Sequence, residues 1–311
     1  MEYILGVDGG GTKTTAVIAD TDGKILAEAI SGGSSYISVG SEKAVKNLNQ
    51  AVFEAMDKIG GSPEIMFRSS CFGSAALNVK KDFDVYGKIV RNKVLIKHLD
   101  PDKILIFNDT RIGLEAGSSA KNKIIIIAGT GSNCFGINEA GRQAGCNGWD
   151  YILADEGSGY EVSIKALRAV MRAYDGRGEK TMLSETVLDE LGLDNEEGIV
   201  KWTYGEDFSK ERLGRFARIV CDCAGRGDSI SRKILKDEAG ESILSVSTVV
   251  NKLGLKDRDF DLVFVGGLFK CEKYFKDIVM DGLEAKFKGI SFKQLVAEPV
   301  QGAIRLALNN L

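Results

Sequence analysis

The sequence predicts a two-domain α/β protein, and three features lead to that prediction. The chain has 311 residues, about twice the ~150 residues of an ordinary domain. A unit of strand, glycine turn and strand begins at Tyr3 and is repeated from Lys123. Elsewhere, strand-like apolar runs alternate with segments of helical spacing, which is typical of layered α/β folds. Two like halves of this kind predict two domains with a cleft between them.

The repeated unit has the same order in both halves. An apolar run leads into small residues, a hydroxyl residue, a second apolar run and a polar turn, as expected for a β-hairpin. This shared order favours an internal duplication over a chance likeness. The first copy comprises 3–7, the turn Asp8-Gly-Gly-Gly-Thr12, 14–18 and the polar turn 20–23; the second comprises 123–127, Ala128-Gly-Thr-Gly-Ser132, 133–137 and 138–141.

The remaining elements follow from periodicity and boundary residues. Ser41 is a plausible cap for the first helix, and Pro299 opens the last one, where a helix tolerates proline. The expected strands are 66–72, 103–107 and 260–265, and the expected helices are 41–58, 110–120, 159–174, 180–191, 210–225, 229–253 and a C-terminal helix from 299.

Charge and composition exclude several classes of partner. The 44 acidic and 41 basic residues leave a net charge of −3, which argues against nucleic acid or an anionic membrane as the main partner. The 37 glycines, with only 3 prolines, indicate sharp turns or close backbone approaches rather than linkers. The longest apolar run, 124–128, is far shorter than a membrane span.

Histidine and cysteine usage limits the chemistry further. The single histidine, His98, lies in a strand-like run before a loop and is expected at the surface, so His-based catalysis and His-rich metal sites are disfavoured. Six cysteines are too few for a disulfide scaffold and indicate a cytoplasmic protein. Cys221 and Cys223, the one close pair, fall on different faces of an expected helix, so a zinc or iron–sulfur site is not favoured.

The glycine turns are suited to binding an anion. A tight turn of small residues points several backbone N–H groups at one place, and two such turns could hold a polyphosphate from both sides. The first turn is not a P-loop, because its spacing differs and a strand follows it. A purely structural hairpin is the alternative for either turn taken alone; Gly266-Gly267 adds a third such site.

Together these motifs resemble the sugar-kinase, heat-shock-protein and actin superfamily. Within it the chain resembles the N-acetylglucosamine kinase branch, in the family shared with the activator ATPases of 2-hydroxyacyl-CoA dehydratases. The resemblance implies two ribonuclease H-like (actin-like) domains with an interdomain cleft: 1–117 joined by the C-terminal helix 299–311, and 118–298 with a helical insertion. The matching motifs are Asp8-Gly-Gly-Gly-Thr-Lys13, Asn108-Asp109, Ala128-Gly-Thr-Gly-Ser-Asn-Cys134, Gly145-Cys-Asn-Gly-Trp149, Asp155-Glu-Gly-Ser158, Ala224-x2-Gly-Asp228 and Val265-Gly-Gly267.

The resemblance also implies a site for ATP and magnesium. Asp8 would hold the Mg2+ that accompanies ATP, and Lys13 adds a positive charge or is simply a surface lysine. The first turn would contact the β- and γ-phosphates, the second would lie opposite, and small residues would flank the nucleoside. The implied nucleotide contacts are Gly10, Gly11, Thr12, Lys13, Thr130, Gly131, Ala224, Gly266, Gly267 and Cys271.

Asp109 is the candidate general base. It follows an expected strand at its carboxyl end, where open α/β sheets bind ligands. A carboxylate there can accept the proton of a sugar hydroxyl as the phosphoryl group arrives. The alternative, which is compatible with catalysis, is an N-cap for the next helix.

A second set of residues is expected to bind the sugar. Polar side chains suit paired hydroxyls and an aromatic edge suits the ring, although Trp149 has core packing as its alternative and 155–158 could simply start a helix. The implied sugar contacts are Ser35, Asp109, Ser132, Asn133, Gly148, Trp149, Asp150 and Asp155.

Several departures from the family pattern leave the sugar open. Ser35 and Ile37 replace an asparagine and a tryptophan, Asp150 replaces a glycine, and Arg111 stands where small residues are usual. N-acetylglucosamine, glucosamine, another N-acylated hexosamine and N-acetylmuramic acid are all compatible, with the 6-hydroxyl as the expected acceptor. Arg111 could pair a lactyl carboxylate, but bracing Asp109 or a neighbouring acid is favoured.

The prediction is therefore an ATP-dependent amino-sugar kinase, with a homodimer as one expected form. One rival is an activator ATPase, which would need exposed cysteines to share an iron–sulfur cluster. The other is a non-enzymatic sugar- and ATP-binding regulator or a filament former.

Overall fold

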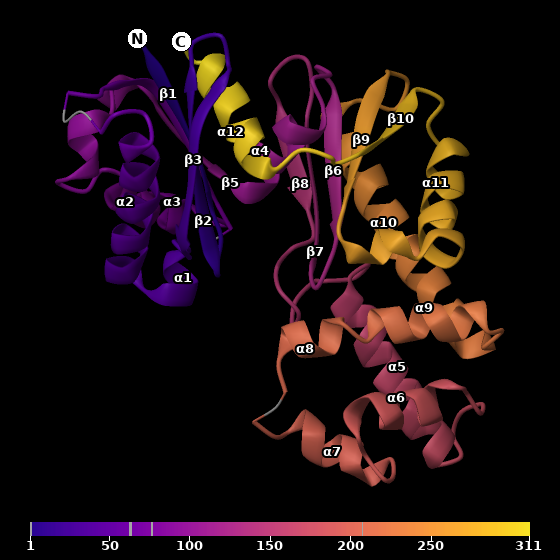
Figure 1. Cartoon of the computed structure of the whole chain (residues 1–311). Coiled ribbons are helices and arrows are strands. Elements are labelled where there is room, and N and C mark those ends of the chain that lie inside the picture. The colour runs from indigo at the N-terminus through magenta and orange to yellow at the C-terminus, as the bar shows by residue number, and fades with distance from the viewer. Residues whose placement is uncertain (1, 62–63, 76, 207) are drawn as a thin grey trace. The chain divides into compact units, whose positions relative to one another are not determined.

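The computed structural model describes residues 2–61, 64–75, 77–206 and 208–311. The chain forms two compact units, residues 1–119 with 295–311 (unit 1) and residues 120–294 (unit 2). Each unit has its own five-stranded sheet and its own helices (Figure 1). The predicted α/β fold class is confirmed.

Unit 1 is a sheet with helices on both faces. Its strand order is β3-β2-β1-β4-β5, antiparallel between β1, β2 and β3 and parallel from β1 through β4 to β5. One face packs on α2 and α3, and the other packs on α12 and α4 (Figure 1). Its elements are β1 (Tyr3–Gly9), β2 (Lys13–Asp20), β3 (Ile25–Gly32), α1 (Tyr36–Val39), α2 (Ser41–Asp57), β4 (Phe67–Ser74), α3 (Lys80–Val90), β5 (Ile104–Asn108), α4 (Asp109–Gly117) and α12 (Pro299–Leu308), with 3-10 turns at Leu95–His98 and Pro101–Lys103.

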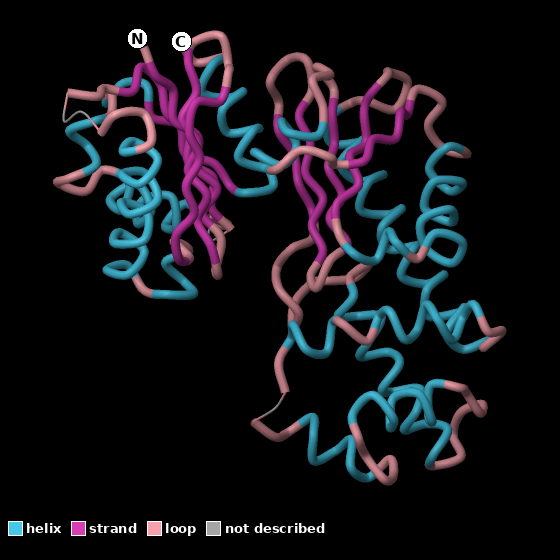
Figure 2. The backbone as a smooth tube through the Cα atoms, in the orientation of Figure 1, coloured by secondary structure: helices cyan, strands magenta, loops and turns pink. Residues whose placement is uncertain are grey.

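Unit 2 repeats this sheet and adds a group of helices. Its order, β8-β7-β6-β9-β10, has the same pattern of antiparallel and parallel neighbours as the sheet of unit 1. In the tube view, helices α5 to α9 gather below the strands of this unit (Figure 2). Its elements are β6 (Lys123–Ala128), β7 (Ser132–Ile137), β8 (Gln143–Cys146), α5 (Gly159–Tyr174), α6 (Leu183–Leu191), α7 (Glu197–Thr203), α8 (Lys210–Gly214), α9 (Ala217–Gly225), α10 (Ser229–Leu253), β9 (Phe260–Val265), α11 (Asp277–Glu284) and β10 (Ile290–Gln294), with short helical turns at Gly267–Lys270 and Glu272–Lys276.

The core of each unit follows from its sequence pattern. The isoleucine run of β6 is buried between its neighbours and α10, as expected for β-branched residues in an inner strand. The long helix α10 begins at Asp228, whose carboxylate accepts the Ser231 N–H, and ends at Gly254 in the left-handed region, a typical pair of helix boundaries. Among the described residues, no helix has the length and apolar character that crossing a membrane requires.

Some local predictions are wrong. Gly40, not Ser41, is the N-cap of α2. The run before His98 is a 3-10 turn rather than a strand, and His98 is half-buried with its ring against Phe53 and its Nδ1 2.9 Å from the Ile65 carbonyl oxygen. The expected single helix 210–225 is two helices, because α8 ends at Gly214 and α9 starts at Ala217.

Candidate functional site

Two carboxylates of unit 1 meet at one edge of its sheet. Asp8 lies near the end of β1 and is paired in register with Gly73 of β4, which is paired with Phe107 of β5. Asp109 comes directly after β5. Because β1, β4 and β5 are parallel, their carboxyl ends share one edge, the edge at which such sheets bind ligands.

Both carboxylates are held in an environment that disfavours their charge. Burial, together with the charge of Asp109, raises the pKa of Asp8 to about 6 although Lys13 opposes the shift. Burial also raises the pKa of Asp109, against the opposing effect of its hydrogen bonds with Thr110. A cation bound beside these groups would offset their mutual repulsion.

The donor set fits magnesium. Mg2+ is usually held by one or two carboxylates plus water and phosphate oxygens rather than by a cage of protein ligands. Asp8 supplies one carboxylate beside the first glycine turn, and the described residues contain no cluster of three or more His, Cys, Asp or Glu that could form a closed metal site. Asp8 is therefore the residue that would hold the ion.

Asp109 does not act as the N-cap of the helix that follows it. Asn108 is the N-cap of α4 and accepts the Thr110 N–H at 2.8 Å, while Asp109 is the first helical residue and its Oδ1 accepts the same N–H at 2.7 Å. The cap therefore does not depend on Asp109, and its carboxylate is held at the start of the helix.

The first glycine turn joins β1 to β2. Gly10 donates its N–H to the Lys13 carbonyl, and its own carbonyl accepts the N–H groups of Ser34 and Ser35. The N–H groups of Gly11 and Thr12 donate to no residue in the described ranges. Free amides in a turn are the arrangement that anions bind. Thr12 and Lys13 are exposed beside them.

Ser35 is less open than the sequence led us to expect. It is 4% exposed, and its Oγ accepts a hydrogen bond from Ser38 Oγ at 3.3 Å. The neighbouring Ile37, by contrast, is exposed.

The second glycine turn joins β6 to β7 and lies on the start of α5. The carbonyls of Gly129 and Thr130 accept the N–H groups of Gly159 and Tyr160 at 2.7 and 3.1 Å. Within the part of the chain that is described, the N–H groups of Thr130 and Gly131 donate to nothing. Unit 2 therefore has a second turn with free amides.

A cavity of about 560 Å3 opens beside this second turn, within the usual size of a cofactor site. Three of the predicted nucleotide residues line it: Thr130, Gly267 and Cys271. Its full lining is Gly129, Thr130, Gly159, Gly214, Arg215, Ala217, Arg218, Cys221, Asp222, Gly267, Leu268, Lys270 and Cys271.

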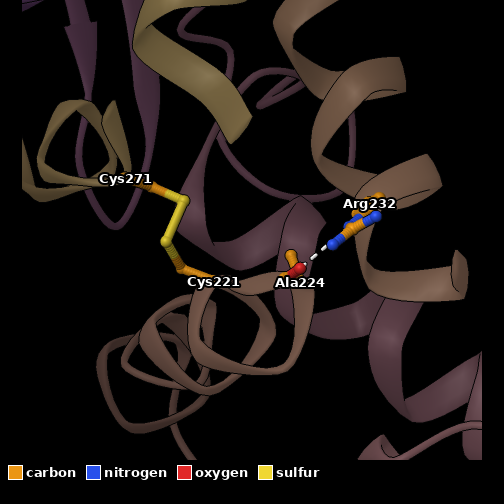
Figure 3. Close-up of a disulfide and its surroundings, with 4 residues drawn as sticks. All are labelled: Cys221, Ala224, Arg232 and Cys271. Atoms are coloured by element: carbon orange, nitrogen blue, oxygen red, sulfur yellow. Dashed lines mark hydrogen bonds between the residues drawn. A yellow bond between two sulfur atoms is a disulfide. The ribbon is translucent and has the colours of Figure 1, made fainter. Parts of the chain in front are cut away.

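Three predicted nucleotide residues of unit 2 lie outside that lining. Gly131 faces Asp155. Ala224 is fully buried, and its carbonyl accepts the Arg232 Nε–H (Figure 3). Gly266 has φ 116°, and a Cβ there would lie 2.3 Å from the Ala128 carbonyl oxygen. Gly266 is required for the close approach of two backbone segments, whereas a Cβ on Gly267 would meet nothing within 4 Å.

The sequence reasoning missed much of this cavity. Ala217 and Cys221 are small residues four positions apart on α9, a spacing that places them on the same face of that helix, and this signal was available in the sequence. The cations Arg215, Arg218 and Lys270 were recognisable only once the fold placed them beside the glycine turn.

A disulfide joins two walls of the cavity. Cys221 of α9 and Cys271, which follows the turn Gly267–Lys270, are bonded with their Cα atoms 5.9 Å apart (Figure 3). One disulfide is not a scaffold, but the sequence did not predict this pairing because the two cysteines are 50 residues apart. Cys71, Cys134, Cys146 and Cys223 are free.

The predicted sugar residues of unit 2 come together around β7. The Ser132 N–H donates to Asp155 Oδ1 at 2.9 Å, and the buried Ser132 Oγ has no hydrogen-bond partner in the described part of the chain. A Cβ on Gly148 would lie 2.9 Å from Asn133 Nδ2. Trp149 is 58% exposed, so it does not pack in the core and its ring is available to a ligand.

An ion-pair network unites the two predicted acids of this group. Lys210 Nζ, from α8, lies 2.5 Å from Asp150 Oδ1 and 2.6 Å from Asp155 Oδ2. Asp155 is almost fully buried. The helix start is capped by Ser158, whose Oγ accepts the Glu161 N–H, so Asp155 is not the cap. Sequence reasoning missed Lys210.

Arg111 braces a neighbouring acid, as favoured from the sequence. It forms an ion pair with Glu115 one helical turn away and lies over the Phe107 ring. The Arg111 Nε atom is buried without a hydrogen-bond partner in the described part of the chain, so the contact with Glu115 engages only one end of the guanidinium.

Comparison with known proteins identifies relatives along nearly the whole chain. A family model described as BadF/BadG/BcrA/BcrD ATPase family matches residues 5–307. An N-acetylmuramic acid/N-acetylglucosamine kinase of Clostridium acetobutylicum is 33% identical over 307 residues, covering 99% of this chain and 98% of the relative. An N-acetyl-D-glucosamine kinase of Dictyostelium discoideum is 31% identical over 324 residues, with 99% and 98% covered.

A solved structure agrees with the fold. A candidate N-acetylglucosamine kinase of Chromobacterium violaceum superposes with a TM-score of 0.73 at 23% identity, covering 99% of each chain. At that identity the likeness shows the fold alone.

Proposed function

Because the chain belongs to the BadF/BadG/BcrA/BcrD ATPase family, we propose that it is an ATP-dependent kinase that phosphorylates an amino sugar. The γ-phosphoryl group of ATP is transferred to a hydroxyl, the 6-hydroxyl by resemblance, of N-acetylglucosamine or a related hexosamine. Two relatives matched over nearly their full length are named as kinases of such sugars.

The observation on which this function depends is the pair of carboxylates at the sheet edge of unit 1. Asp109 is the proposed general base: it takes the hydroxyl proton as the oxygen bonds to phosphorus, and ADP leaves. The raised pKa of Asp109, caused by burial, makes it a stronger base than an exposed aspartate. Asp8, beside it, would hold Mg2+, which neutralises the charge that develops on the transferred phosphoryl group.

The nucleotide is proposed to lie in the cavity of unit 2. Small residues such as Gly214, Ala217 and Gly267 leave room for a flat base. The free amides of the two glycine turns, at Gly11, Thr12, Thr130 and Gly131, are the proposed donors to the phosphate oxygens.

The sugar is proposed to bind beside β7 of unit 2, at Ser132, Asn133 and Trp149. The Ser132 hydroxyl is buried without a partner, and such a hydroxyl is a ready donor or acceptor for a ligand. Asn133 offers an amide close to Gly148, and the exposed Trp149 ring offers an apolar face. Ser35 would contribute only through its backbone or after its side chain moves.

The activator ATPase is the second candidate function, and the family itself suggests it. The described cysteines offer little support, since two form a disulfide and Cys71, Cys134 and Cys223 are buried. Iron content and an absorption spectrum of anaerobically purified protein would reveal a shared cluster.

The decisive assay measures ADP release across a panel of hexosamines, with and without N-acetyl and lactyl groups. We expect rapid release with at least one hexosamine and slow hydrolysis without sugar, because water lacks the contacts that position a sugar hydroxyl. Equal rates with and without every sugar would contradict the proposal. A cytoplasmic location and a homodimer stay predictions.

A further inference from the structure

The segment that carries Trp149 has an unusual backbone. Asn147 and Asp150 have φ of 66° and 69°, and no other non-glycine residue among those described has a positive φ. A side chain disfavours this region, although Asn and Asp tolerate it better than most residues. The Asp150 backbone is therefore in a region that few residue types other than Gly, Asn and Asp adopt readily.

The Asp150 side chain forms an ion pair with Lys210. Its Oδ1 lies 2.5 Å from Lys210 Nζ and also accepts the Tyr151 N–H at 2.9 Å. Lys210 lowers the pKa of the Asp150 carboxyl. Burial alone would lower the pKa of Lys210, but its two carboxylate partners hold that pKa above the ordinary value. The ammonium is therefore charged, and it is shared between two acids.

The two acids differ in what else they do. The Asp155 side chain is 3% exposed and holds the Ser132 amide, so it needs Lys210 as its counterion inside the protein. The Asp150 side chain is 69% exposed and has no partner in the described ranges besides Lys210 and Tyr151. Asp150 thus occupies the solvent side of Lys210, next to Trp149.

We infer that Asp150 is a specificity-determining residue: by neutralising the exposed side of Lys210, it makes the proposed sugar site favour uncharged and amine-bearing hexosamines over hexosamines that carry a carboxylate. This inference rests on the proposed function. With Asp150 present the charges of Lys210, Asp150 and Asp155 sum to −1, so a carboxylate on the sugar is repelled. Without that charge they sum to zero, and an ammonium N–H becomes available to the sugar.

The test compares two sugars that differ by a lactyl carboxylate, N-acetylglucosamine and N-acetylmuramic acid. Asp150→Asn removes the charge but keeps a residue that tolerates positive φ. We expect the ratio of kcat/KM for N-acetylmuramic acid to that for N-acetylglucosamine to rise about tenfold in this variant. The gain should shrink as salt is added, because the new contact is electrostatic and partly exposed.

Two further variants test whether the rise in the kcat/KM ratio depends on the Asp150–Lys210 ion pair rather than on a general loss of negative charge. Glu156→Gln removes the same charge from an exposed neighbour whose side chain has no described partner, and it should leave the ratio unchanged. Asp150→Asn combined with Lys210→Met should lose the gain. Calorimetric binding of N-acetylmuramic acid without ATP should show the same order, and it provides a readout if the double variant turns over poorly.

The outcomes separate this inference from the proposed function. An unchanged ratio in Asp150→Asn, or an equal rise in Glu156→Gln, with both proteins active on N-acetylglucosamine, overturns the inference and leaves the kinase assignment intact. Wild-type protein that turns over and binds no hexosamine overturns the proposed function itself.

Discussion

The two glycine hairpins have the same topology but different surroundings. In unit 1 the turn follows a strand that carries Asp8, and its Gly10 carbonyl accepts amides of the loop at Ser34 and Ser35. In unit 2 the turn follows Ala128, and its carbonyls accept the first amides of helix α5. Unit 1 thus has the pair Asp8 and Asp109 at its sheet edge, whereas the cavity described beside a glycine turn belongs to unit 2, so two sheets of the same topology carry different candidate functional groups.

The largest expected effect is on turnover, and it follows from replacing a carboxylate of unit 1. Asp109→Asn should reduce turnover by a factor of about 10² to 10⁴, because the amide cannot accept the hydroxyl proton. ADP affinity, measured by calorimetry, should stay within about twofold, since the proposed nucleotide cavity belongs to unit 2.

Asp102→Asn is the matched control for that variant, because Asp102 is exposed in the turn before β5. Its turnover should equal that of the wild type. Full activity in Asp109→Asn would rule out Asp109 as the base.

The next prediction concerns the cavity and compares adjacent glycines. Gly267→Val should weaken ADP binding about tenfold with little change in melting temperature, because its side chain would enter open space in the cavity. Gly266→Ala should instead destabilise unit 2 by about 2 kcal/mol or more, because its Cβ would overlap Ala128 and its φ is 116°. Thermal unfolding and calorimetry on both variants test this contrast. The reverse pattern would show that Gly267 is structural.

A pH prediction tests the carboxylate pair without substrate. Burial raises the pKa of Asp8 to about 6, so its contribution to stability is full below pH 4 and is lost as the pH rises through 6. At pH 7, Asp8→Asn should therefore have a free energy of unfolding higher than that of the wild type, by at most about 3 kcal/mol. This difference should vanish near pH 4. Denaturation curves at both pH values provide the measurement. An equal difference in the free energy of unfolding at both pH values would mean that the pKa of Asp8 is not raised.

The smallest expected effect concerns the disulfide in the cavity wall. Reduction, or Cys221→Ser, should weaken ADP binding about threefold, because Cys221 and Cys271 tie two lining segments together and a preorganised site binds more tightly. Cys223→Ser, on the same helix but outside the lining, should leave the affinity unchanged. The same loss in both serine variants would indicate general loosening of α9.

Sequence patterns predicted the inner elements well and the sheet edges poorly. The boundaries of α5, α10 and β9 follow directly from periodicity and capping residues. The strands without a prediction, β3, β8 and β10, are all at sheet edges. In β3, polar residues interrupt the apolar ones and the buried side chains are only Ala27 and Ala29, so this strand lacks the continuous apolar run on which such predictions depend. The edge strand β5 has such a run and was predicted.

Candidate site residues could be predicted where the functional side chain lies within a short sequence motif. Asp8 and Asp109 could be proposed from the sequence because each lies at the end of an expected strand, Asp8 beside a glycine turn. Lys210 could not, since its role depends on α8 placing it 2.6 Å from Asp155, 55 positions earlier in the chain. The buried Ala224 shows the converse, because small size alone does not say whether a residue lines a cavity.

Photolabelling tests most directly where the nucleotide binds. A photoreactive ATP analogue should label peptides that contain residues 210–225 or 266–276, the label should be lost on competition with ATP, and Asp109→Asn should be labelled as strongly as the wild type. Competed labelling confined to residues 1–119 would contradict the division of roles between the units.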